Sequence, residues 1–173
     1  MSNVDQMFLV ITCADDSTAL MGFVITERRK DGSVRWQQLA TKENVENIII
    51  QSTLSWSPEK LPVKSWRFVT EEERAMYEQR EYRNALRDDG VVITHHMPTA
   101  REIHKEKMRQ ARAPLLTTLD LAIIRADEIR DNIKKTDIIS QKQALRNVTD
   151  DPAIEAAQTI EVLRSVWPAI LVG

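Results

Sequence analysis

The chain has 173 residues, of which 42% are hydrophobic and 29% are charged, and its formal net charge is −2. This composition is that of an ordinary globular protein, and it excludes a disordered, collagenous or coiled-coil chain. Uninterrupted apolar stretches such as residues 48–50 are far shorter than the roughly 20 residues of a membrane span, so we expect no association with membranes. Neither a basic flank nor a long apolar region marks the N-terminus, so we expect no secretory signal.

Aromatic residues divide the chain into two parts. Eight of the nine precede residue 98, and only Trp167 follows it. Because aromatic side chains favour the half-buried surfaces of strands, we predict a β-rich domain over residues 1–97 and a helical domain over residues 98–173.

The first 40 residues predict an antiparallel meander. Residues 7–13 form an apolar, β-branched run typical of a buried strand, and residues 20–27 read as a second strand. The Asp31-Gly32 pair between residues 27 and 34 tolerates the positive φ of a tight hairpin turn, so residues 34–39 are predicted to return as a third strand.

Helix caps locate the next elements. Thr41 is placed to cap a helix that runs to Ile50, and residues 55–62 form a loop. Alternation of apolar and polar residues over 63–69 indicates a half-exposed strand. Thr70 and Glu73 have the spacing of a capping box that opens a short helix. A turn at residues 88–90 then precedes a short strand at 91–94.

From Pro98 onward the pattern is helical. One apolar face is predicted, and Pro114 is expected to kink the helix or to restart it. The residues assigned to that face are Ala100, Ile103, Lys107 and Ala111, with Leu115, Leu119, Ala122 and Ala126 continuing it.

Thr136 is predicted to cap a second helix, which would form a hairpin with the first. Between these helices we expect Leu119, Ala122, Ile139 and Leu145 to be buried. A break at residues 150–152 and a cap at Thr159 predict a last short helix over 160–166. The predicted fold class is therefore α+β: a small, mostly antiparallel N-terminal sheet with short helices, followed by a C-terminal helical hairpin and a terminal helix.

No pattern in the sequence predicts catalysis. The only cysteine, Cys13, lies in a strand run and is expected to be a buried structural thiol. His95 and His96 would point to opposite faces of a strand, and with Glu102 and His104 they do not have the spacing of zinc ligands. We therefore expect no enzymatic activity, no catalytic residues, no metal site and no cofactor.

Residues 98–112 are basic, with a net charge of +3 when His104 is neutral. Clustered cations can neutralise phosphates, but the segment has no aromatic residue on which a base could stack. Its mixed signs are those of a solvated helix face, so we do not expect binding to nucleic acid. The five cations are Arg101, Lys105, Lys107, Arg109 and Arg112.

Three segments carry a resemblance to a known family. They are RQARAPLLTTLD at residues 109–120, KQALRN at 142–147 and the Val-Trp-Pro at 166–168. In this order they resemble the C-terminal helical module of tailed-bacteriophage proteins of the tail-assembly-chaperone and tail-fibre-assembly type. The resemblance covers roughly residues 80–168, whereas residues 1–79 match no family known to us.

The resemblance implies a non-enzymatic bacteriophage protein that binds other phage structural proteins as a tail or tail-fibre assembly factor. The alternative is a permanent virion component, such as a minor tail, fibre-attachment or capsid-decorating protein. The implied partners are phage tail, fibre or capsid proteins, and further copies of the chain are left open. The implied location is the host cytoplasm during assembly, with the virion as the alternative.

Two hypotheses concern particular side chains of the helical part. Arg112 and either Asp120 or Asp127 are placed to pair with Arg146 on the second helix, or else these are ordinary exposed charges. Trp167 either anchors the terminal helix on the hairpin or forms an apolar patch for a phage partner. In the second reading the partner-binding residues are Leu163, Trp167, Ile170 and Leu171.

Overall fold

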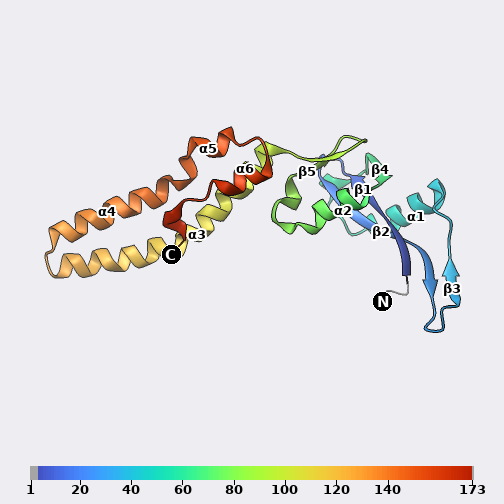
Figure 1. Ribbon diagram of the computed structural model, residues 1–173, viewed down its shortest axis with the longest axis horizontal. Helices are drawn as coiled ribbons and strands as arrows, with labels where there is room; N and C mark the ends of the chain where they lie inside the picture. The colour runs from blue at the N-terminus through green and yellow to red at the C-terminus, as the bar shows by residue number, and fades with distance from the viewer. Residues whose placement is uncertain (1–3, 173) are drawn as a thin grey trace. The chain divides into compact units, whose positions relative to one another are not determined.

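A computed structural model describes residues 4–172 of the chain (Figure 1). The fold is α+β, as predicted, and the chain divides into two compact units, Met1–His95 and His96–Gly173. The boundary between them lies two residues before the one that the sequence predicts.

Unit 1 is built on a four-stranded antiparallel sheet with the strand order β3-β2-β1-β4. Strands β1 (Val4–Thr12) and β2 (Thr18–Arg28) pair along their whole length. The β2–β3 turn holds Gly32 at φ +85°, and β3 (Val34–Gln37) forms one edge of the sheet. Strand β4 (Ser65–Phe68) pairs with the end of β1 and forms the other edge.

Helices and a small ribbon connect these strands. Helix α1 (Lys42–Thr53) begins after Thr41, whose side chain accepts the Asn44 amide, and the 3₁₀ helix η1 (Pro58–Lys60) follows it. Helix α2 (Glu71–Glu78) opens with the predicted capping box. The 3₁₀ helix η2 (Arg80–Ala85) leads into a ribbon of β5 (Leu86–Asp88) and β6 (Ile93–His95). Neither η2 nor β5 was expected from the sequence, and β6 begins two residues later than the predicted strand.

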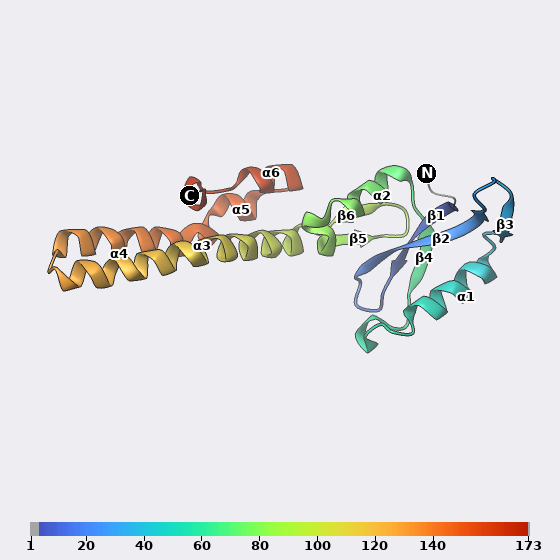
Figure 2. The same cartoon turned by 90° about the horizontal axis from the view of Figure 1, so that it is seen from below.

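Alternation along β1 produces two cores, one on each face of the sheet, because successive side chains of a strand point to opposite faces. Leu9 and Ile11 pack with Phe23 and with Val45 and Ile49 of α1. On the other face Val10 packs with Tyr77 of α2 and with the β5–β6 ribbon. Figure 2 shows α1 on one side of the sheet and α2 on the other.

Unit 2 is a helical hairpin with short C-terminal helices. Helix α3 (Met97–Glu128) and helix α4 (Asn132–Asn147) lie side by side, and Figure 2 shows them as a long antiparallel pair. The 3₁₀ helix η3 (Val148–Asp150), helix α5 (Pro152–Ala156) and helix α6 (Ile160–Ser165) follow. Thr159 caps α6 as predicted, and the 3₁₀ helix η4 (Ala169–Leu171) packs with α6 against α3. None of the helices between residues 4 and 172 is long and apolar enough to cross a bilayer.

Three details of unit 2 correct the sequence predictions. Helix α3 continues through Pro114 without interruption. Of the predicted apolar face, Ala100 and Ala126 are fully buried and the other members are half-buried, but the helix also buries His104 and Met108, which were not predicted. Helix α4 begins five residues earlier than expected, because Asp131 and not Thr136 caps it.

The predicted interior of the hairpin is partly wrong. Leu145 is buried at 2% exposure, but Ile139 is 52% exposed and points away from α3. Leu119 and Ala122 are half-buried.

The predicted side chains of α3, Arg112, Asp120 and Asp127, do link the two hairpin helices, but through partners other than the guanidinium of Arg146. The guanidinium of Arg112 donates to the backbone carbonyl of Arg146 at 2.6 Å. The contact is therefore made by the backbone of Arg146 and not by an ion pair of the Arg146 side chain. Asp120 pairs with Lys142, and Asp127 pairs with Lys135 at 2.5 Å. These contacts recur along both helices and set their register.

Candidate functional site

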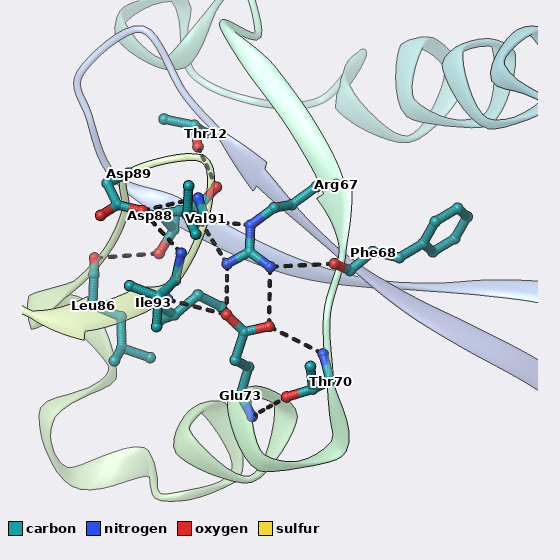
Figure 3. A network of polar contacts seen from close by, with 12 residues as sticks. Thr12, Arg67, Phe68, Thr70, Glu73, Leu86, Asp88, Asp89, Val91 and Ile93 are labelled. Carbon is teal, nitrogen blue, oxygen red and sulfur yellow. Dashed lines mark hydrogen bonds and ion pairs between the residues drawn. The ribbon is translucent and has the colours of Figure 1, made fainter.

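The most strongly connected polar group of unit 1 is the guanidinium of Arg67 on β4. Figure 3 shows it between two carboxylates. Its Nη2 and Nη1 donate to the two oxygens of Glu73 at 2.6 and 3.0 Å, and its Nε donates to Asp88 at 2.9 Å. The side chains of Arg67, Glu73 and Asp88 are 20%, 9% and 1% exposed. Two buried carboxylates therefore share one cation.

Glu73 also accepts two backbone amides, from Thr70 at 3.0 Å and from Ile93 at 3.1 Å. The hydrogen bond from Arg67 is the largest cause that holds the pKa of Glu73 at about 2, and the same hydrogen bond raises the pKa of Arg67. Because both groups remain ionised near neutral pH, neither can exchange a proton there. The network fastens α2, β4 and β6 together and is a structural clamp.

The histidines considered as metal ligands lie apart. His95 belongs to β6, and Nδ1 of His96 contacts the Thr99 hydroxyl at 2.8 Å. His104 is buried on α3, where its Nε2 donates to the Val166 carbonyl at 2.8 Å, while Glu102 pairs with Lys105 at 3.2 Å. Between residues 4 and 172 no three His, Cys, Asp or Glu side chains are grouped to hold a metal ion.

Cys13 lies just beyond β1 and is 1% exposed. Its backbone amide donates to the Ser17 carbonyl at 2.9 Å, which closes the turn between β1 and β2. The thiol is buried, as the sequence predicts.

The basic residues at the start of α3 make contacts within unit 2. Arg101 donates to the Ala157 carbonyl at 2.9 Å, and Lys105 pairs with Glu155 of α5 at 2.6 Å. Arg109 pairs with Glu106 at 3.3 Å. Arg101 and Lys105 hold α5 on α3 with side chains that are only 16% and 18% exposed, whereas Arg109 pairs along the exposed face of α3, so the predicted solvated face describes only part of this segment.

The four predicted partner-binding residues are divided by the fold. Leu163 and Leu171 are buried at 0% and 9% exposure, which corrects the expectation that all four form a surface patch. Trp167 and Ile170 remain 37% and 41% exposed. The Trp167 ring stands edge-on to the His104 ring, with 5.6 Å between their centroids, so this tryptophan contacts α3 as an anchor would.

An apolar groove lies beside α1 and was not predicted. It has a volume of about 620 Å³ and runs between the C-terminal half of α1 and residues 61–63. Ile50 and Leu54 on its wall are 57% and 72% exposed, and Leu61 opposite them is 36% exposed. The signal was present in the run of three isoleucines at 48–50, because three consecutive helical residues cannot all face one sheet.

Comparisons with known proteins add no relative. No protein-family model, curated protein or solved structure matches the chain.

Proposed function

We propose that this chain is a non-enzymatic protein of a tailed bacteriophage, and that it binds phage structural proteins during assembly of the tail or the tail fibre. One observation, the apolar groove beside α1, supports the proposal that the chain binds another protein. The assignment to a phage rests on the sequence motifs between residues 80 and 168.

The groove has the composition of a docking surface for an apolar segment. Its exposed walls are aliphatic, and large exposed aliphatic side chains gathered along one groove favour an interaction site over ordinary surface. The partner that fits is a tail, fibre or capsid protein that presents an apolar strand or helix. Trp167 and Ile170 of unit 2 are the remaining exposed members of the predicted partner-binding set, but the Trp167 ring already contacts His104, so the groove is the favoured partner surface.

Charge substitutions in the groove test the binding. Ile50→Lys and Leu54→Lys place an ammonium in the groove, and Val91→Lys is the matched control because Val91 is 82% exposed in the β5–β6 turn, outside the groove. Tagged variants are produced in phage-producing cells, and the phage proteins that co-purify are identified by mass spectrometry.

We expect both groove variants to lose a co-purifying tail or fibre protein that the wild-type chain and the Val91→Lys control retain. If no phage structural protein co-purifies with the wild-type chain, or if the groove variants retain it, the proposal is wrong.

Purified virions separate the assembly factor from the alternative, a permanent virion component. A transient factor acts in the host cytoplasm and is absent from finished particles, whereas a structural component is present at a fixed ratio to the other tail proteins. Quantitative mass spectrometry of the particles measures this ratio.

A further inference from the structure

A second cavity in unit 1, of about 460 Å³, is polar and shares no lining residue with the apolar groove. The first residues of β2, the end of α2 and the 3₁₀ helices η1 and η2 form its wall. The wall residues whose side chains can donate a hydrogen bond are Thr18, Lys60, Tyr77, Arg80, Arg83 and Asn84. Its volume falls within the roughly 300–1,000 Å³ of small-molecule sites.

The charge on the wall is unbalanced. Lys60, Arg80 and Arg83 contribute three cations. The single carboxylate of the wall, Glu78, is bound by Arg74 outside it at 3.1 Å. In the part of the chain that the structure describes, the guanidinium groups of Arg80 and Arg83 make no ion pair and no hydrogen bond. Cations gathered around one concave surface attract an anion, because the low-dielectric wall focuses their field.

A buried donor belongs to a residue in the wall of the cavity. Tyr77 is 4% exposed, and its hydroxyl lies beside the Thr18 hydroxyl but completes no hydrogen bond with any described residue. The Thr18 hydroxyl donates elsewhere, to the Leu86 carbonyl at 3.2 Å. Burial raises the pKa of Tyr77 to about 12, so its hydroxyl keeps its proton at neutral pH. A buried hydroxyl without a hydrogen bond costs stability, and an acceptor placed in the cavity would remove this cost.

We propose that this cavity binds a small phosphate monoester. Two guanidinium groups and an ammonium carry enough positive charge to neutralise the charge of nearly −2 that a monoester carries at neutral pH, and each guanidinium can hold two phosphate oxygens. The Tyr77 hydroxyl and the Asn84 amide supply neutral donors. A carboxylate offers one charge and two oxygens, so it matches this set less well. The site goes beyond the proposed assembly role and does not depend on it.

Titration of the full-length chain tests the site. Inorganic phosphate, ribose 5-phosphate and adenosine monophosphate are each titrated at constant ionic strength, with sodium chloride as the reference, and binding is followed by calorimetry. We expect saturable binding of at least one of them. Tighter binding of a monoester than of inorganic phosphate identifies an organic phosphate as the ligand. Equal binding identifies the free anion and overturns the monoester.

Two variants test the residues. Arg80→Gln/Arg83→Gln removes both guanidinium groups, and Arg29→Gln/Lys30→Gln removes two cations from the β2–β3 hairpin as the matched control. We expect the first to weaken binding by about tenfold or more, which is the loss of at least one charge-assisted hydrogen bond, and the control to keep wild-type affinity.

Tyr77→Phe removes only the hydroxyl and keeps the ring in the core. Since this hydroxyl lacks a hydrogen bond in the free protein, we expect an unchanged or higher melting temperature together with affinity lowered by about tenfold. The proposal is wrong if no phosphate compound binds saturably, if both double variants bind equally, or if Tyr77→Phe binds as the wild type does.

Discussion

Replacing Arg67 by methionine tests whether the buried clamp of unit 1 stabilises the fold. The change leaves two carboxylates without their cation. Glu73 keeps two backbone donors, but Asp88, 1% exposed at its side chain, keeps only the Thr12 hydroxyl at 3.4 Å. Removing one partner of a buried ion pair lowers the free energy of unfolding by about 3–5 kcal/mol. We therefore expect Arg67→Met to lower the free energy of unfolding of unit 1 by about this amount at pH 7.

The loss should depend on pH. The pKa of Glu73 is about 2 in the folded protein against 4.5 for the free side chain. Because the folded value is the lower one, this carboxylate stabilises the fold fully above pH 4.5, and the contribution disappears as the pH falls toward 2. The shift corresponds to about 3 kcal/mol. Arg67→Met removes the main cause of the shift, so the difference between wild type and variant should shrink between pH 7 and pH 3.

Urea unfolding followed by tryptophan fluorescence measures both effects. A Trp167→Phe background confines the signal to unit 1, where Trp56 and Trp66 pack against the core. Arg35→Met is the control, since its ion pair with Glu27 at 2.9 Å is exposed and contributes less than about 1 kcal/mol. If Arg67→Met costs no more than this control, or costs the same at pH 3 and pH 7, the clamp does not stabilise the fold through its buried ion pairs.

Four further substitutions test the capping box of α2, the helical hairpin and the contact of Trp167 with α3. Thr70→Ala removes one half of the capping box, so urea unfolding should show a loss of about 1 kcal/mol, and an unchanged midpoint would mean that the cap does not stabilise α2. Leu145→Ala should lower the free energy of unfolding by about 2–5 kcal/mol because Leu145 is 2% exposed. Ile139→Ala should lower it by less than about 1 kcal/mol because Ile139 is 52% exposed. Equal losses would contradict the assigned faces of α4. Trp167→Ala removes the ring that contacts His104, so the midpoint of thermal unfolding should fall by several degrees. We expect co-assembly with the proposed phage partners to survive this change. Lost co-assembly at an unchanged midpoint would identify Trp167 as a partner contact.

Much of the fold could be predicted from patterns formed by residues that are adjacent in the sequence. Strands β1 and β2, the Gly32 turn and the caps at Thr41, Thr70 and Thr159 each follow from a few adjacent side chains, and the structure contains all of them. A Ser or Thr hydroxyl one residue before a helix accepts a hydrogen bond from a backbone amide of the first turn, which has no partner within the helix. This interaction is local, so it does not depend on where the helix packs in the tertiary fold.

Helix α3 shows where local reasoning fails. Proline removes one helical hydrogen bond and disfavours the preceding turn, but Pro114 is exposed, where water can reach the carbonyl that it leaves free. Contacts with α4 on both sides of it, from Arg112 and Asp120, hold the helix together across this position. These contacts join residues more than 20 positions apart, and periodicity within one helix does not reveal them.

The candidate sites were harder to predict than the fold. Leu163 and Trp167 were chosen because they are apolar and near the C-terminus, and only the packing of α6 and η4 against α3 distinguishes the buried residue from the exposed one. The polar cavity joins Thr18, Lys60 and Tyr77, which are distant in sequence and carry no shared motif. Each is unremarkable alone, and only the antiparallel sheet with α2 against it brings them together.

The single thiol of the chain offers a readout that needs no substitution. Cys13 is covered at the end of the central strand β1, so a thiol reagent can label it only when this end of the sheet opens. When closing is faster than labelling, the labelling rate divided by that of a free cysteine gives the equilibrium constant for opening. The same measurement with and without a phosphate compound would report whether the ligand makes the end of β1 open less often.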